Sequence, residues 1–184
     1  MIITKNNFLQ KEDFQHILSV SSNLSKINEN ELKINTASLI HKNGSIINQG
    51  IFDKIFLKNF HEKYTPQALK ILEEINYQKL QTFEYSSLSI IQTGKNYKFP
   101  IHQDTIKKIL SGVIYLSPEI NLGTIFYDDK KGKNKKVKEW RVNRAVFFSR
   151  KENKSWHSYE ADKLSERIVL VYNLFTNDKK KICN

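Results

Sequence analysis

Cysteine is almost absent from this sequence. Cys183 stands alone, so no disulfide can form within the chain, and a zinc site built from several cysteines is excluded. Long apolar runs are also missing, since no stretch approaches the roughly 20 apolar residues that a membrane helix needs. The first 17 residues carry acids and amides where a signal peptide would need an unbroken apolar segment. We therefore expect a cytoplasmic protein with no membrane association.

Arginine is scarce, although the chain is strongly basic. The net charge is +11, yet arginine occurs only at Arg141, Arg144, Arg150 and Arg167, so lysine supplies nearly all of the positive charge. Nucleic-acid-binding proteins favour arginine, because its planar guanidinium forms paired hydrogen bonds with bases and phosphates. A nucleic-acid partner is disfavoured on this ground but left open. The basic run at 130–138 contains Gly132 and Asn134, and we interpret it as a solvated loop.

The length and composition indicate one globular domain spanning 1–184. The chain has 184 residues, of which 39% are hydrophobic and 27% charged, and this is enough to bury a core. Neither an internal repeat nor a linker rich in Pro, Gly or Ser divides it. The region 1–79 has mainly helical patterns, whereas 80–176 has the short alternating patterns of strands. No pattern indicates an oligomeric state.

The first region predicts helices at 10–20 and 51–60, because apolar residues recur there at helical spacing. Thr65 and Pro66 predict the start of another helix, reaching about residue 75, since threonine caps helices and proline suits the first helical position. A short strand at 2–4 is also expected, and 32–41 is ambiguous.

The second region predicts a series of short strands separated by turns. A series of this kind is typical of a β-sandwich or jelly roll. We therefore predict a mainly β, α+β fold: a double-stranded β-helix (a jelly-roll, cupin-like barrel) with the N-terminal helices packed on one sheet. The expected strands lie at 88–92, 109–116, 124–127, 137–142, 145–149, 156–159 and 167–175.

Three side chains in this region form a candidate metal site. In an extended segment His102 and Asp104 point to the same face, because strand side chains alternate. His157 lies in a separate predicted strand. Two histidines and one carboxylate are the facial triad of non-haem Fe(II) oxygenases, which leaves coordination positions open for a co-substrate and O2. By itself, the His102–Asp104 pair would be read as a surface histidine beside a solvated acid.

Arg167 begins an apolar strand and would need an anionic partner if buried, since an unpaired buried charge is very costly. Its guanidinium can hold a carboxylate through two hydrogen bonds. Alternation along the strand puts Arg167, Val169, Val171 and Asn173 on one face, with Asn173 near the barrel mouth. Alternatively, Arg167 is an edge residue paired with Glu166 or Asp162.

These residues stand in segments that resemble the 2-oxoglutarate/Fe(II) dioxygenase superfamily, and within it the prolyl-hydroxylase-like branch. The likeness covers roughly 80–176 well, covers the N-terminus loosely, and hardly extends to 21–64. Only Gly123 remains where many relatives have two glycines, and Tyr172-Asn173 stands where some peptide hydroxylases have tryptophan. The matching segments are His102-x-Asp104, 111–116 (SGVIYL), 122–127 (LGTIFY), 143–149 (NRAVFFS), 156–158 (WHS) and 167–171 (RIVLV).

The resemblance implies roles for these residues. His102, Asp104 and His157 would bind Fe(II), and Arg167 would bind the distal carboxylate of 2-oxoglutarate. The hydroxyl of Tyr115 would help to bind that carboxylate, with a core aromatic as the alternative, and Gln92 would face the co-substrate unless it faces water. The enzyme would hydroxylate an unactivated C–H bond while converting 2-oxoglutarate and O2 to succinate and CO2, with ascorbate as a supporting reductant.

The substrate is less well indicated. The resemblance favours a prolyl residue of a protein or peptide, with a free amino acid or other small metabolite as the alternative. Lys107 and Lys108 are interpreted as solvated charges beside the site. Two other classes of function remain open: a non-catalytic cupin-like binding module and a basic nucleic-acid-binding protein. The candidate substrate-contacting residues are Trp156, which could equally be a packing residue, and Asn173, Lys98, Thr105 and Arg141.

Overall fold

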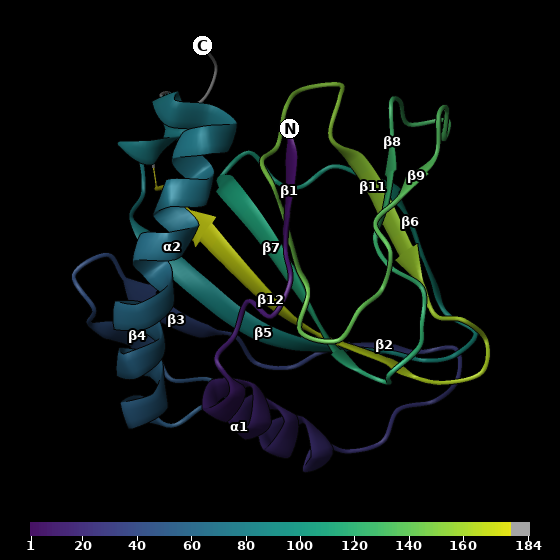
Figure 1. The fold of residues 1–184 in the computed structure, drawn as a ribbon, viewed down its shortest axis with the longest axis horizontal. Helices are drawn as coiled ribbons and strands as arrows, with labels where there is room; N and C mark the ends of the chain where they lie inside the picture. Colours follow the sequence, from purple (N-terminus) through teal and green to yellow (C-terminus); the bar gives the residue numbers. More distant parts are fainter. Residues whose placement is uncertain (178–184) are drawn as a thin grey trace.

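The computed structural model describes residues 1–177 and contains two antiparallel sheets facing each other, with two helices outside the larger one (Figure 1). Cys183 lies outside the described residues. The larger sheet has the strand order β1-β10-β7-β12-β5-β3-β4, with β2 also paired to β5. Its strands are β1 (Ile2–Lys5), β2 (Leu32–Ile34), β3 (Ser38–His41), β4 (Ile46–Asn48), β5 (Tyr85–Thr93), β7 (Lys108–Ser117), β10 (Ala145–Phe148) and β12 (Arg167–Phe175).

The smaller sheet has the order β6-β11-β8-β9 and covers one face of the larger sheet. Its strands are β6 (Lys98–His102), β8 (Ile125–Tyr127), β9 (Lys136–Val137) and β11 (Trp156–Glu160). Two sheets packed in this way confirm the predicted jelly-roll barrel. The strand expected at 137–142 is wrong in extent, because pairing with β8 ends at Val137. The lysine-rich segment between β8 and β9 is largely exposed, as expected of a solvated loop.

The helices α1 (Lys11–Ser22) and α2 (Lys54–Leu80) pack on the outer face of the larger sheet. The Asp53 side chain caps α2 by accepting a hydrogen bond from the Phe56 amide at 2.8 Å. The predicted helix start at Thr65-Pro66 is wrong, since α2 continues through Pro66. Residues four apart are buried along one stripe on both sides of this proline, at positions 56, 60, 64, 68 and 72. Packing of that stripe therefore outweighs the backbone hydrogen bond lost at proline.

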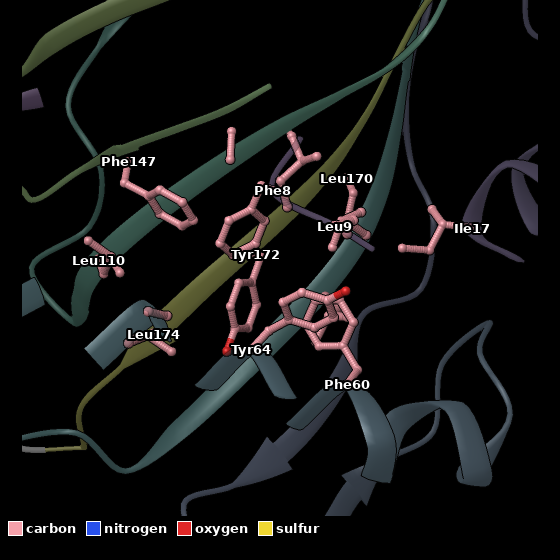
Figure 2. Packing of buried hydrophobic residues seen from close by; sticks show 14 of the residues in the cluster. Phe8, Leu9, Ile17, Phe60, Tyr64, Leu110, Phe147, Leu170, Tyr172 and Leu174 are labelled. Carbon is pink, nitrogen blue, oxygen red and sulfur yellow. The ribbon is translucent and has the colours of Figure 1, made fainter. Parts of the chain in front are cut away.

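β12 separates two apolar cores through the alternation of its side chains. Leu170, Tyr172 and Leu174 enter the core between the sheet and the helices, which Figure 2 shows in part. There the Tyr172 ring meets Phe60 of α2 edge to face at 5.1 Å. Val169 belongs instead to a smaller core between the two sheets. The helices thus support one face of β12 and leave its other face for the barrel interior.

The first region is less purely helical than predicted, because β1–β4 all join the larger sheet. The ambiguous segment 32–41 supplies two of these strands, both paired with β5. Among the described residues, no helix has the length and apolar character needed to cross a membrane.

Candidate metal and co-substrate site

His102, Asp104 and His157 converge inside the barrel. His102 ends β6 and lies directly opposite His157 of β11 in the strand register. Their rings are 4.2 Å apart between centroids, and the His157 Nε2 atom lies 3.9 Å from Asp104 Oδ2. Each of the three residues offers one ligand atom, and these atoms all lie within 4.8 Å of one another. Such a donor set suits a small divalent cation such as Fe(II).

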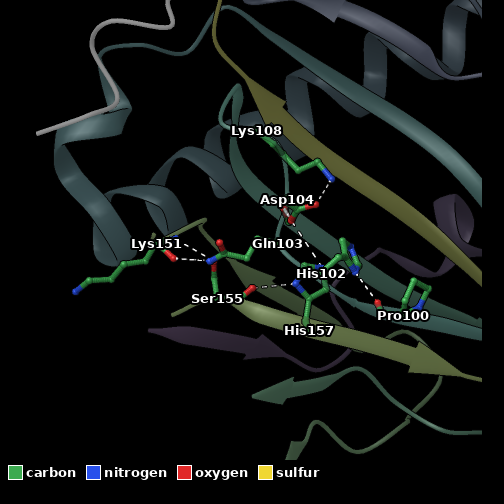
Figure 3. A network of polar contacts seen from close by, with 9 residues as sticks. Pro100, His102, Gln103, Asp104, Lys108, Lys151, Ser155 and His157 are labelled. Atoms are coloured by element: carbon green, nitrogen blue, oxygen red, sulfur yellow. Dashed lines mark hydrogen bonds and ion pairs between the residues drawn. The ribbon is translucent and has the colours of Figure 1, made fainter. Parts of the chain in front are cut away.

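Backbone carbonyls orient both imidazoles (Figure 3). The Nδ1 atom of His102 lies 3.0 Å from the Pro100 carbonyl oxygen, and that of His157 lies 3.1 Å from the Ser155 carbonyl oxygen. A carbonyl can only accept, so each Nδ1 carries the proton and Nε2 keeps its lone pair for a metal. Burial lowers the pKa of His157 to about 4, although Asp104 opposes this effect. His157 is therefore neutral at physiological pH, as a metal ligand must be.

Asp104 is held by two donors on β7. Lys108 Nζ donates to Oδ1 and Ser111 Oγ donates to Oδ2, both at 2.5 Å. Burial acts to raise the pKa of the Asp104 carboxyl, but Lys108, His157 and Ser111 outweigh it and the pKa is lowered. The carboxylate is consequently ionised and fixed in position. The interpretation of Lys108 as a solvated charge was wrong, because its side chain is only 19% exposed and pairs with Asp104.

Arg167 is buried without a carboxylate partner. It is 1% exposed, and its Nε atom donates to the Leu122 carbonyl oxygen at 3.2 Å. Its Nη2 atom has no hydrogen-bond partner among the described residues. The alternative pairing with Glu166 or Asp162 is wrong, since no carboxylate in residues 1–177 forms an ion pair with Arg167.

Three aromatic rings surround the guanidinium. The carbon Cζ of Arg167 lies 4.8 Å from the ring centroid of Tyr159, 5.4 Å from that of Trp140 and 5.7 Å from that of Tyr115. Rings stabilise a cation through their faces but give no acceptor to its N–H groups. Burial lowers the pKa of Arg167, while the two tyrosines oppose this effect. An anionic ligand would satisfy the remaining N–H groups of this desolvated cation.

One cavity of about 170 Å³ joins the triad to Arg167. The alternating residues Arg167, Val169, Val171 and Asn173 of β12 all line it, as the period-2 pattern predicted. The remaining lining residues are Ile34, Ile91, Phe99, His102, Asp104, Lys108, Ser111, Val113, Thr124, Phe148, His157 and Tyr159. Apolar side chains thus form most of the wall between the candidate metal ligands and the arginine.

The structure does not bring the Tyr115 hydroxyl into this cavity. The hydroxyl accepts from the Thr124 amide at 2.8 Å and is within hydrogen-bonding distance of Thr124 Oγ1 and of the Lys138 carbonyl oxygen. Thr124 lines the cavity in its place. Gly123 allows the Lys138 carbonyl oxygen to approach the backbone closely, because a Cβ atom at this position would lie only 1.7 Å from that oxygen.

Gln92 is also turned away from the cavity. It pairs with Ile168, next to Arg167, so strand alternation places it on the opposite face. Its amide binds Asn35, the Ser25 carbonyl oxygen and Glu166. Its expected role toward the co-substrate is therefore not supported.

Of the five predicted substrate residues, only Asn173 lines the cavity. Trp156 precedes the inward-facing His157 and does not line the cavity, as strand alternation requires. Lys98 forms an ion pair with Glu160, and Thr105 is exposed. Arg141 lines a separate hollow with Trp140 and Arg144.

Sequence reasoning missed four lining residues with polar groups: Lys108, Ser111, Thr124 and Tyr159. Tyr159 could have been found from the sequence, because it lies two residues after His157 on β11 and so shares its face. Ser111 and Thr124 lie inside segments that resemble the dioxygenases, but no local pattern marks their direction.

Neither a protein-family model nor a curated protein sequence matches this chain. Several solved structures, in contrast, are similar to it. A Pseudomonas putida prolyl-4-hydroxylase is 13% identical and superposes with a TM-score of 0.61 over 96% of this chain and 93% of that chain. The chain has the fold of this hydroxylase.

Two further structures extend this likeness. A Burkholderia pseudomallei protein of the 2OG-Fe(II) oxygenase family is 13% identical, with a TM-score of 0.57 over 95% of this chain and 84% of that chain. HygX from Streptomyces hygroscopicus, solved with nickel and 2-oxoglutarate bound, is 7% identical, with a TM-score of 0.60 over 96% of this chain and 83% of that chain. At these identities the likeness concerns the fold, and the chemistry rests on the side chains of this chain.

Proposed function

We propose that this protein is an Fe(II)- and 2-oxoglutarate-dependent dioxygenase that hydroxylates an unactivated C–H bond. The observation that carries the proposal is that the His102, Asp104 and His157 triad and the partnerless Nη2 of Arg167 belong to one apolar cavity. A non-catalytic module would have no need for both a metal-ligand set and a buried cation lacking its anion. The nucleic-acid alternative rests on the net charge of +11 alone.

The residues fit both groups chemically. The two Nε2 atoms and one carboxylate oxygen would hold Fe(II), while the Arg167 guanidinium would receive the distal carboxylate of 2-oxoglutarate. Bound together, these groups supply the oxidising chemistry, in which one oxygen atom of O2 enters the substrate C–H bond and the other enters succinate as CO2 leaves. Val169, Val113 and Phe148 line the cavity and would keep water from the reacting atoms.

The chain itself contributes orientation and charge. Pro100 and Ser155 keep the imidazoles in the metal-binding tautomer, and Lys108 and Ser111 keep Asp104 ionised and directed. Because the Tyr115 hydroxyl engages Thr124, the residues that would help Arg167 bind a carboxylate are Thr124 and Tyr159, which both line the cavity. These supporting contacts fix the ligands before any metal binds.

The decisive experiment measures succinate after the protein is incubated with Fe(II), 2-oxoglutarate and ascorbate under air. Slow, uncoupled succinate formation is expected without a substrate and should disappear in His157→Ala. A panel of prolyl peptides and free amino acids, read by the mass gain of one oxygen atom, would then identify the substrate. If the iron-loaded protein neither binds 2-oxoglutarate nor forms succinate, the proposal is wrong.

A further inference from the structure

The cavity has a polar end formed by β7 and β12, away from Arg167. Asn173 follows Arg167 by six residues on the same strand face, which corresponds to roughly 20 Å along an extended strand. Asn173 lies opposite Ser111 in the register, and Ser111 donates to the candidate metal ligand Asp104. Lys108 also lines the cavity and holds the same carboxylate. A substrate bound beside the metal would therefore meet Asn173 and Lys108.

Asn173 offers an unused acceptor there. The residue is 7% exposed, and its Oδ1 atom has no hydrogen-bond partner in residues 1–177. Leaving a buried carbonyl oxygen unsatisfied is costly, so a hydrogen-bond donor from a ligand is expected at this position. A charged donor such as an ammonium group binds such an acceptor more strongly than a neutral donor does.

The charge of the cavity indicates a second substrate group. Its formally charged lining residues are Asp104, Lys108 and Arg167, which together carry one positive charge. Fe(II) and the 2-oxoglutarate dianion cancel each other, so the loaded cavity keeps that positive charge. Asp104 would bind the metal and Arg167 would pair with the co-substrate. The positive charge of Lys108 would then be the one that remains without a full counter-charge. An internal prolyl residue of a peptide has no charged group that could pair with Lys108, whereas a free carboxylate could.

The wall between this polar end and Arg167 is apolar. Val171 and Val113 are register partners on β12 and β7, next to the Asn173 and Ser111 pair, and both line the cavity. An aliphatic group could lie against them without leaving a polar atom unsatisfied. The polar end therefore complements a molecule with a carboxylate, an ammonium group and an aliphatic chain.

We propose, building on the function proposed above, that the substrate is a free aliphatic α-amino acid. Its carboxylate pairs with Lys108 Nζ, its ammonium donates to Asn173 Oδ1, and its side chain lies against Val113 and Val171. Lys108 then both positions Asp104 and selects the substrate. The hydroxylated C–H bond belongs to the aliphatic side chain.

The test compares free amino acids with derivatives that lack one charge. L-leucine, L-isoleucine, L-valine and L-proline are titrated calorimetrically into Fe(II)- and 2-oxoglutarate-loaded protein without O2, beside their amides and N-acetyl forms. At least one free amino acid should bind about 10- to 100-fold more tightly than either derivative. A hydrogen bond that involves a charged group is stronger than a neutral one, and the difference in free energy corresponds to a ratio of this size. With O2, the same amino acid should gain one oxygen atom.

Substitutions show which residues produce the preference for the free amino acid over its derivatives. Lys108→Met should bring the affinity ratio of acid to amide close to one, and Lys108→Arg should keep most of it. Asn173→Leu should remove the preference over the N-acetyl form. Lys107→Met, which removes a neighbouring charge that does not line the cavity, should leave both ratios unchanged.

The outcomes separate the two proposals. If 2-oxoglutarate neither binds nor is consumed, both proposals are wrong. If it is consumed but no free amino acid binds better than its amide, or only prolyl peptides gain oxygen, the amino-acid proposal alone is overturned. The same holds if Lys108→Met retains the full ratio of acid to amide.

Discussion

Replacing Arg167 by methionine tests the site most directly. Methionine keeps a long apolar side chain but removes the guanidinium, and with it the hydrogen bond to Leu122 and three ring contacts. Those losses oppose the gain from no longer burying a charge, which amounts to several kcal/mol. We therefore expect the free energy of unfolding of the ligand-free protein to change by less than about 2 kcal/mol.

The effect on the co-substrate should be much larger. Removing one partner of a buried, hydrogen-bonded charge pair costs about 2–5 kcal/mol, which corresponds to a roughly 30- to 4,000-fold weaker affinity for 2-oxoglutarate. At about 100 times its dissociation constant, 2-oxoglutarate should stabilise the wild-type protein by about 2.7 kcal/mol. For a chain of this length that raises the Tm by roughly 5–10 °C.

The assay is thermal unfolding of the Fe(II)-loaded protein with and without 2-oxoglutarate, with calorimetric titration as the direct measure. At the same ligand concentration, Arg167→Met should show a shift below about 3 °C. Arg141→Met is the matched control, because Arg141 is exposed and does not line the cavity. A variant that binds 2-oxoglutarate within tenfold of wild type would refute the role given to Arg167.

Three further predictions concern other contacts. Asp104→Ala should weaken Fe(II) binding by more than about 100-fold while the barrel stays folded, as measured by metal titration and circular dichroism. Tyr115→Phe should lower the free energy of unfolding by about 1–3 kcal/mol, because it leaves the buried Thr124 amide unpaired, but should change 2-oxoglutarate affinity less than tenfold. Burial lowers the pKa of Lys79 to about 8, so folding favours its neutral form, and the free energy of unfolding should rise by up to about 3 kcal/mol between pH 8 and 10.5. In urea titrations Lys79→Met should lose this rise, and the exposed Lys70→Met on the same helix should keep it.

The sequence was most informative where the chemistry of a residue and the alternation of a strand were sufficient to predict which way the side chain faces. The alternation from Arg167 to Asn173 predicted four residues on one face, and all four line the cavity. The His102–x–Asp104 spacing likewise predicted a shared face, and the cavity includes both residues. Local geometry decides these features, because a strand alternates regardless of what packs against it.

The partners of polar side chains could not be predicted in this way. Gln92 and Tyr115 were placed at the co-substrate, but pairing with β12 turns Gln92 away and Thr124 engages the Tyr115 hydroxyl. Similarly, the sequence indicated a solvated Lys108, but in the structure its side chain pairs with Asp104. Each error concerns the partner of a polar group, which the folded chain decides even where, as for Lys108 and Asp104, the two residues are close in sequence.

By itself, therefore, the sequence determined the barrel class, the candidate metal ligands and the arginine with its alternating neighbours, because residue chemistry and strand period are local properties. Only the tertiary structure decided that Arg167 lacks a protein anion, that α2 runs through Pro66, and that Lys108 belongs to the cavity. These features arise from burial and from pairing between β5, β7 and β12, which are separate in sequence and adjacent only in the folded sheet.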